Sequence, residues 1–378
     1  MPGATNQRTG RVTRLTDDPG ATSFSSGGNA SIFLAERTFV ISHGPLSTDL
    51  EALWRQHLER VEDPAHYNSP EFFAEPYWEG LQPFAILSLE RGKVVGVLTG
   101  HHTEFSLTCG LQSRPQISID KTADPLSVSD ALCEGLLYEA GHAKLITLFS
   151  WSGAQLAGFE QQGYRCSQLE GNVVLDLRQG VDALYKNFHE NRRRNIRTAV
   201  RKGIEVREET TQEDLAAYWE VYSAWRNTKR KTIHHDRSFA ALEKVHNMRG
   251  NHRRFLAFYK GKAVAATGVR FFPGGLIEYA NNCSLDEFIH LRPNDLLIWK
   301  TIQWACEMGF SKYSLGGAHP FLRKSGGTVI PTCRYRLDRT FLHRHDLRDD
   351  ILGIARKAFH SMPNPIKNRI RKVFRKAT

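Results

Sequence analysis

The sequence predicts an α/β fold in which two tandem lobes each build a mixed α+β sheet, followed by C-terminal helices. The length of 378 residues fits two domains at roughly 150 residues per domain. Each half runs strand, helices, meander of strands, helix and strand, an order that requires a mixed sheet with helices on its faces. The two halves also resemble each other, because GKVVGVLTG at Gly92 recurs 169 residues later as GKAVAATG at Gly261.

Four segments follow from composition and pattern. Residues 1–31 are rich in Gly, Ser, Thr, Asp and Arg without hydrophobic periodicity, which predicts a disordered tail. Residues 32–180 form the first lobe and residues 181–345 the second. Residues 346–378 predict a basic, amphipathic helical tail.

In the first lobe, a strand near Thr38–Ser42 precedes a helix that begins at Thr48, where Glu51 completes a capping box. Pro70 opens a short helix. Two strands, FAILSLE and VVGVLTG, flank the tight turn RGK. A helix over about 129–142, the strand KLITLFSW, a helix over about 153–162 and a strand that ends near Leu177 complete the lobe.

In the second lobe, a long helix over about 181–202 leads into the strand GIEVREE. Helices over about 211–229 and 238–248 come next. Three strands follow, RRFLAFY, AVAATGVRFF and LIEYANN. Pro293 opens a helix that ends at Gly309, and the strand KYSL, a glycine-rich loop and the strand TCRYRLDRTFL come last.

Composition excludes several classes of protein. No apolar run approaches the ~18 residues of a membrane-spanning helix, and the N-terminus has no apolar core of a secretory signal. The six scattered cysteines indicate reduced thiols and a cytoplasmic protein. Neither His-His pair has metal-ligand spacing, so we expect no metal site. Motifs for dinucleotides, P-loops and serine hydrolases are also absent from the sequence.

Charge divides the chain into two unlike halves. Residues 1–180 hold 13 basic and 21 acidic residues, whereas residues 181–378 hold 38 basic and 19 acidic residues. The net charge of +11 therefore combines an acidic half with a strongly basic one. This asymmetry indicates an anionic partner for the second half, namely nucleic acid, a phosphorylated ligand or a membrane surface.

A basic helix concentrates part of this charge. Arg193, Arg197 and Arg201 recur at four-residue spacing with Arg194 beside them, opposite an apolar stripe. Their mutual repulsion would be relieved by an anion, and arginine binds phosphate in a bidentate way. The alternatives are a phosphate contact with substrate, donor or RNA, and a solvated charged face.

The element order, the doubling and the stretch Leu291–Gly317 resemble tandem-lobed N-acyltransferases of the GNAT superfamily. Within it, the chain is similar to Fem-type aminoacyl transferases and to the acyltransferases grouped with the cellulose-biosynthesis protein CelD. The helix Asn191–Val206 is also similar to that group. The resemblance covers about Phe39 to Leu342 and is strongest in residues 185–320. It implies a tandem GNAT fold and N-acyl transfer.

The resemblance places the reaction centre between the strands LIEYANN and KYSL. Glu278 is the only acid in its strand and is the candidate base, with a cross-strand ion pair to Arg270 as the alternative. Tyr279 and Tyr313 are candidate proton donors, or packed core aromatics. Asn281 or backbone amides are candidates to hold the oxyanion. Simple alternation would place Tyr279 and Asn281 on one face of the strand and Glu278 on the other.

The second lobe's main helix begins with Arg292, Asn294 and Asp295 around Pro293, and a helix N-terminus favours anions. Acetyl-CoA enzymes of the superfamily usually carry a Q/RxxGxG/A loop there, whereas this chain has no glycine at that place. The alternative for Asn294 and Asp295 is simple stabilisation of the first helical turn.

The loop after KYSL carries further candidates. Relatives commonly have an aspartate where this chain has Ser314, which leaves the general base open. The resemblance implies donor- or substrate-binding roles here and a lysine or arginine facing the reaction centre, with surface charge as the alternative. His319 is a candidate base, or an innocuous loop histidine. The candidates in this loop are Gly316, Gly317, His319, Arg323 and Lys324.

The C-terminal segment predicts two amphipathic helices, over 349–362 and after Pro365. The second has an apolar stripe opposed by Lys and Arg, the composition of a helix on anionic lipid. Docking on the body or RNA contact are the alternatives. The protein is then cytoplasmic, with peripheral contact at the inner face of the membrane through residues 363–378.

The function expected from all this is transfer of an acyl group, acetyl in the first instance, from acyl-CoA to an amine of an envelope, polysaccharide or amino-sugar precursor. No metal is needed. The partners are a phosphorylated donor and a small amine acceptor. One alternative is a Fem-type transferase that uses aminoacyl-tRNA, to which the basic second half is suited. Another is a non-catalytic module that binds nucleic acid or membrane.

Overall fold

The structure is a computed structural model. It describes residues 7–12, 37–44, 46–74, 81–110, 116–151, 156–228 and 251–363, together with Pro365 and Lys367. The expected helix over 238–248 and almost all of the last fifteen residues lie outside these ranges.

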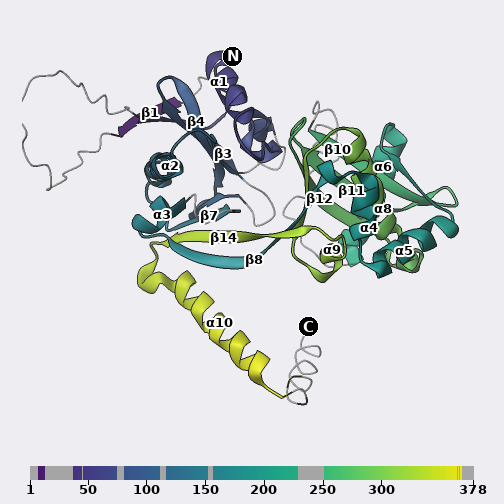
Figure 1. Ribbon diagram of the computed structural model, residues 1–378. Helices are drawn as coiled ribbons and strands as arrows, with labels where there is room; N and C mark the ends of the chain where they lie inside the picture. The colour runs from purple at the N-terminus through teal and green to yellow at the C-terminus, as the bar shows by residue number, and fades with distance from the viewer. Residues whose placement is uncertain are drawn as a thin grey trace, which may run out of the picture.

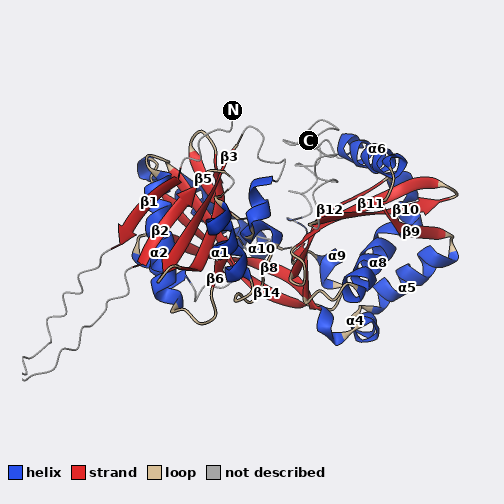
Figure 2. Ribbon diagram, turned by 90° about the horizontal axis from the view of Figure 1, so that it is seen from above, coloured by secondary structure: helices blue, strands red, loops and turns tan. Residues whose placement is uncertain are grey.

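A single mixed sheet runs through both lobes (Figures 1 and 2). Its strand order in the described part is β1-β2-β3-β4-β5-β7-β14-β8-β13-β12-β11-β10-β9, and β6 pairs with β4. The mixed α/β fold expected from the sequence is confirmed. The strands are β1 Gln7–Val12, β2 Arg37–Ser42, β3 Gln82–Glu90, β4 Lys93–His102, β5 Ser106–Cys109, β6 Ile117–Ile119, β7 Leu145–Ser150, β8 Arg165–Asp176, β9 Ile204–Glu208, β10 His252–Tyr259, β11 Lys262–Phe271, β12 Leu276–Ser284, β13 Lys312–Gly317 and β14 Thr328–Asp338.

Helices cover both faces of each half of the sheet. In the first lobe α1 and α2 lie on opposite faces, and in the second lobe α6 lies opposite α8 with α4 and α5. Each lobe therefore buries two apolar layers. The helices are α1 Thr48–Leu58, α2 Pro125–Ala140, α3 Ala157–Gln161, α4 Val181–Asn187, α5 Glu190–Arg201, α6 Gln212–Thr228, α8 Pro293–Glu307, α9 Pro320–Arg323 and α10 Arg344–Ser361.

The repeated hairpins share one turn geometry. Arg91 and Gly92 between β3 and β4 both have positive φ, of 52° and 75°, and Lys260 and Gly261 between β10 and β11 have 49° and 80°. Two consecutive residues with positive φ form the tight turn whose twist matches the flanking strands. The sequence repeat is therefore also a repeat of backbone conformation.

The lobes exchange strands. β14, from the second lobe, pairs with β7 of the first lobe through Cys333–Asp338. In return β8, from the first lobe, pairs with β13 of the second. The two exchanged strands also pair with each other along most of their length. Figure 1 shows them as two long arrows that bridge the lobes.

Three boundaries differ from the sequence prediction. The helix expected over 181–202 is two helices, because Phe188 is extended and the His189 Nδ1 caps α5 by accepting from the Asn191 N–H. α2 begins earlier than expected, at Pro125, where the Asp124 carboxylate accepts from the Ser127 N–H. Within the expected disordered tail, β1 is a strand, since antiparallel pairing with β2 needs backbone groups and no apolar pattern.

Candidate functional site

A notch opens in the second lobe where β12 and β13 separate. The two parallel strands pair only through Leu276, Ile277 and Glu278, opposite Lys312, Tyr313 and Ser314. Both strands continue past this point, to Ser284 and Gly317, without pairing to each other. Glu278 and Ser314 therefore mark the vertex of the notch. Beyond them, the backbone N–H and C=O groups of β12 and β13 that face each other form no hydrogen bonds between these two strands.

A bulge in β12 changes which residues share a face. Gly268 of β11 pairs with Asn281 and Val269 pairs with Tyr279, so Ala280 has no partner in β11. Tyr279 packs on the α8 side, whereas the Asn281 side chain bonds the Gly268 N–H and the Tyr218 hydroxyl on the α6 side. The expectation that Tyr279 and Asn281 share a face was wrong, because a bulge shifts the alternation by one residue. The Asn281 side chain therefore points away from the notch.

The N-terminus of α8 lies at this notch without a side-chain cap. Its N-cap residue, Arg292, has left-handed backbone (φ 65°) and makes no capping hydrogen bond, and Pro293 follows at the first helical position. In the first lobe, the equivalent helix α2 is capped by Asp124. The first backbone N–H groups of a helix and the helix dipole favour an anion, and among the two main helices only α8 lacks a side-chain cap.

Arg192 of α5 reaches the same place. It is completely buried, its Nη1 lies 3.6 Å from the Asp295 Oδ1, and its Nη2 donates to the Phe321 carbonyl. The guanidinium also stacks 4.4 Å from the centre of the Phe321 ring. Burial lowers the pKa of Arg192, against the opposing effect of Asp295. The Nε and Nη1 atoms have no hydrogen-bond partner in the described part of the chain.

Asp295 is nearly buried at the start of α8 and is surrounded by cations. Asn195 donates to its Oδ2 at 3.0 Å. Burial raises the pKa of Asp295, while Arg192, Asn195 and, more weakly, Arg292 and Lys324 lower it. Three cations thus face one carboxylate, which leaves a local positive excess. A guanidinium with two nitrogens that lack hydrogen-bond partners among the described residues, beside an uncapped helix start, fits an anionic group such as phosphate.

Asn294, Tyr279 and Tyr313 occupy different depths around the notch. The Asn294 amide donates to the Ser284 Oγ at 3.1 Å, and its Oδ1 is buried without a partner among described residues. Burial raises the pKa of the Tyr279 hydroxyl, which keeps it protonated at neutral pH. Tyr313 is fully buried and donates to the Thr301 Oγ1 at 3.1 Å, a position in the core rather than in the notch.

The basic helix divides its arginines between surface and interior. Arg193 donates to the Lys186 carbonyl at 2.7 Å, and Arg194 and Arg197 are exposed. Arg197 lines a shallow groove with Tyr185 and Trp299 between α4, α5 and α8. These three side chains therefore lie on the outer surface, apart from the Arg192–Asp295 pair.

The loop after β13 is built around its own backbone. Gly316 has φ 93°, a conformation that favours glycine, and Gly317 faces open space. His319 is exposed and caps α9 by accepting from the Phe321 N–H, and the Arg323 Nε donates to the Ala318 carbonyl at 2.8 Å. Of this loop, Lys324 comes close to Asp295.

Glu278 lies on the face of the sheet away from α8. It is buried, directly opposite Arg270 across β11 and β12, the arrangement that the cross-strand alternative requires. In parallel register it lies beside Ser314, two residues from Lys312. This face looks toward the first lobe, since Arg270 lies over the Tyr67 ring, with 6.0 Å from its guanidinium carbon to the ring centre.

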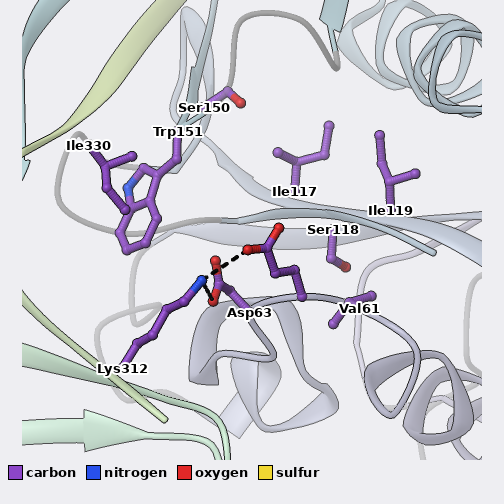
Figure 3. Close-up of a pocket in the computed structure, with 10 residues that line it drawn as sticks. Val61, Asp63, Ile117, Ser118, Ile119, Ser150, Trp151, Lys312 and Ile330 are labelled. Atoms are coloured by element: carbon purple, nitrogen blue, oxygen red, sulfur yellow. Dashed lines mark hydrogen bonds and ion pairs between the residues drawn. The ribbon is translucent and has the colours of Figure 1, made fainter. Parts of the chain in front are cut away.

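A pocket of about 210 Å³ lies between the lobes on this side (Figure 3). Lys312 enters it and pairs with Asp63 at 2.7 Å and Glu62 at 3.1 Å. Although burial acts to lower it, these carboxylates raise the pKa of Lys312. The Trp151 indole N–H is buried without a partner among described residues. The remaining walls are Val61, Ile117, Ser118, Ile119, Ser150 and Ile330.

Sequence reasoning missed Arg192 and the pocket. Arg192, Ile196 and Ala199 follow helical spacing and are the buried residues of α5, so an arginine on the apolar face was a readable signal. Glu62, Asp63 and Trp151 had no such signal, because the pocket forms only when the lobes meet. No group of three His, Cys, Asp or Glu suited to a metal occurs in the described residues. Nor, over the same residues, does any helix combine the length and apolarity needed to cross a membrane.

Two family models match parts of the chain. A family model described as an acetyltransferase (GNAT) domain matches residues 186–322, and a FemAB family model matches residues 122–242. No curated protein sequence matches the chain.

Three solved structures have a fold similar to most of this chain. FemX is 14% identical, with 78% of this chain and 97% of that chain covered and a TM-score of 0.60. L-PGS from Bacillus licheniformis is 14% identical over 79% and 94% of the two chains, with a TM-score of 0.53. A tandem GNAT protein from the clavulanic acid biosynthesis pathway is 12% identical over 81% and 99%, with a TM-score of 0.52.

Proposed function

For this chain, an acyltransferase with a tandem GNAT, Fem-like fold, we propose that the second lobe transfers an acyl group from acyl-CoA to an amine of an envelope, polysaccharide or amino-sugar precursor. The observation that carries the proposal is the uncapped start of α8 beside the buried Arg192, at the notch between β12 and β13. Acetyl is the acyl group we expect first.

The donor's pyrophosphate would bind at the start of α8, where backbone N–H groups and Arg192, Arg292 and Lys324 supply positive charge. Its thioester would then extend into the notch. A carbonyl oxygen there can accept from backbone N–H groups of β12 near Ala280, which the bulge removes from register. Such preorganised donors stabilise the oxyanion that develops during attack.

Glu278 is the proposed base at the vertex of the notch. The amine nitrogen attacks the thioester carbon, a C–N bond forms, and the amine proton passes to the Glu278 carboxylate. The tetrahedral intermediate then collapses, the C–S bond breaks and the thiolate leaves. Tyr279, whose hydroxyl stays protonated because burial raises its pKa, is placed on the donor side, where it can donate a hydrogen bond to the departing thiolate sulfur; the proton on Glu278 then passes to solvent.

The acceptor would enter from the inter-lobe pocket, on the same side of the sheet as Glu278. Glu62 and Asp63 attract an ammonium group, and the Trp151 indole offers a ring face and an N–H to a sugar or peptide (Figure 3). The carboxylates of Glu62 and Asp63 and the flat indole of Trp151 therefore both support an amine acceptor.

A second candidate is transfer from aminoacyl-tRNA. The favouring observation is the exposed basic surface of α5, where Arg194, Arg197 and Arg201 point outward on the helix that also carries Arg192. The FemAB match also supports it. Phosphate contacts of this kind contribute salt-sensitive affinity for RNA. The phosphorylated donor at α8 is common to both candidates.

The test is an assay of thiol release from a panel of acyl-CoA donors with amine acceptors, run beside an assay of aminoacyl-tRNA deacylation. We expect acyl-CoA turnover, and we expect Glu278→Gln to lower kcat by about 10²–10⁴-fold because the general base is lost. Glu307→Gln, at an exposed position on α8, is the matched control. Wild-type kcat in Glu278→Gln would remove Glu278 from the mechanism, and turnover with aminoacyl-tRNA alone would favour the second candidate.

A further inference from the structure

The helix α10 leaves the body of the protein. It follows the short turn Phe341–His343, and Figure 1 shows it projecting away from both lobes. Among its described side chains, the ion pairs to the body lie in the first two turns. Asp349 pairs with Arg334 and Arg336 at 2.6 and 2.7 Å, and Asp350 pairs with Arg165.

The outward side of α10 is apolar. Leu347, Ile351 and Ile354 follow helical spacing and expose 51, 57 and 68% of their surface. Ala355 and Ala358 continue the stripe and are also exposed. Just before the helix, Phe341 and Leu342 expose 87 and 68%. A contiguous stripe of exposed apolar side chains indicates an interaction surface.

The charged residues of α10 are also distributed unequally between the side that faces the body and the exposed side. Its three acidic residues, Asp346, Asp349 and Asp350, all pair with arginines of the body. The exposed Arg348 and Lys357 flank the apolar stripe on either side. From residue 351 to the end of the sequence there are eight basic residues and no acidic one. Arginines of the body thus pair with all three acids, of which Asp350 stays half exposed, and the other exposed side chains described on the helix after Asp350 are apolar, small or positive.

We propose that α10 is an interfacial helix that lays its apolar stripe, Leu347, Ile351 and Ile354, on an anionic lipid bilayer. The occupant follows from charge complementarity, because an apolar stripe flanked by lysine and arginine matches acyl chains below negative headgroups. A second copy of the chain would bring the same positive charge to the contact. The proposal places the surface on α10 itself, and it is independent of which acyl group or amine the enzyme uses.

The experiment is flotation of the full-length protein with vesicles of phosphatidylcholine, with and without phosphatidylglycerol. We expect binding to the anionic vesicles that weakens with salt. Ile351→Ser/Ile354→Ser should lower the partition coefficient by more than about tenfold, because two exposed apolar side chains that would enter the bilayer are lost. Arg348→Gln/Lys357→Gln should lower it by about tenfold or more on anionic vesicles and flatten the salt dependence.

Met308→Ser, an exposed apolar position at the end of α8, is the matched control and should bind as the wild type does. Circular dichroism checks that each variant is folded. The proposal is overturned if Ile351→Ser/Ile354→Ser floats as well as the wild type. It is also overturned if the protein ignores vesicles and light scattering shows a dimer that this variant dissociates, or if the variant instead loses affinity for tRNA alone.

Discussion

The proposed donor site depends most on Arg192 and Asp295. The pair is buried, and both pKa values are shifted by burial toward the neutral forms. A buried pair of this kind adds little stability compared with an apolar pair of equal volume, yet breaking it exposes an uncompensated charge. Its presence therefore favours a role in binding over a role in folding.

Arg192→Met tests this directly. We expect the free energy of unfolding to fall by about 3–5 kcal/mol, because Asp295 is left buried without its partner. Arg192→Met/Asp295→Leu should recover most of that loss. Urea unfolding of the three proteins measures both values, and a double variant as unstable as the single one would show that the pair is needed for folding.

We expect His57 to make the protein less stable in acid. Burial, reinforced by Arg60, lowers the pKa of His57 to about 4 from the ordinary 6.5, and its Nε2 lies 2.9 Å from the Ser118 Oγ in the wall of the inter-lobe pocket. The unfolded chain therefore binds a proton more readily than the folded chain. Neutral His57 therefore contributes roughly 3 kcal/mol to the free energy of unfolding, fully above pH 6.5, and this contribution is lost as the pH falls toward 4.

In thermal melts across this range, His57→Gln should flatten the decline of stability with falling pH. His142→Gln, at an exposed position, should leave the wild-type slope unchanged. Parallel curves for wild type and His57→Gln would mean that other groups cause the acid sensitivity.

Individual site residues could be predicted from the sequence where their role follows from a local sequence pattern. Glu278 as the sole acid of its strand and the anion-favouring start of α8 were both visible as candidates. Tyr313 was equally visible but lies in the core, because only packing decides which strand aromatics are buried. Residues of the inter-lobe pocket depend on contacts more than 200 positions apart, such as Lys312 with Glu62, and no local pattern encodes these.

Among the elements, β8 has the most demanding geometry. Gly171 interrupts it with φ 83°, and a Cβ there would lie 2.4 Å from the Ile330 carbonyl oxygen of β14. Gly171 lies where the register between β8 and β14 shifts, and the residues directly after it, from Asn172 on, pair with β14 on one side and with β13 on the other. Glycine is required here both for the backbone angle and for the close approach of two strands.

Gly171→Ala should therefore destabilise the protein more than Gly203→Ala does. Gly203, after α5, has φ 80° but open space around it, so its replacement carries only the strain of the backbone angle, about 1–2 kcal/mol. Chemical unfolding of both variants gives the difference. Equal losses would show that β14 moves aside and that the crossing is not tightly packed.

Most elements were predictable because caps, turns and periodicity are local. The two hairpins and α8 follow from Gly92, Gly261, Pro293 and Gly309. The bulge at Ala280 and the break at Phe188 were not, since each is imposed by what the backbone packs against rather than by its own residues.

At the scale of the whole molecule, strand exchange joins the lobes. A cut at residue 180 would leave β13 and β14 in one piece without β8, their common partner. The predicted boundary at 180/181 therefore divides the sequence into two halves, but the hydrogen-bonded sheet continues across it. We expect calorimetry to show one unfolding transition for both lobes, and two well-separated transitions would contradict this coupling.

The unequal charge of the halves has a structural counterpart. The first lobe caps its main helix with its own carboxylate and supplies Glu62 and Asp63 to the inter-lobe pocket, whereas the second leaves its main helix open beside Arg192. We interpret the acidic lobe as the side that receives an amine and the basic lobe as the side that holds an anionic donor.

The most direct test of this account is the affinity for the donor, measured by calorimetric titration of acyl-CoA, and of aminoacyl-tRNA, into the wild type and into Arg192→Met/Asp295→Leu. The account predicts that the wild type binds one of these donors and that the double variant, although stable, binds it at least about tenfold more weakly because a charged hydrogen-bond donor to phosphate is lost. Equal affinity in the two proteins would contradict a donor site at the start of α8.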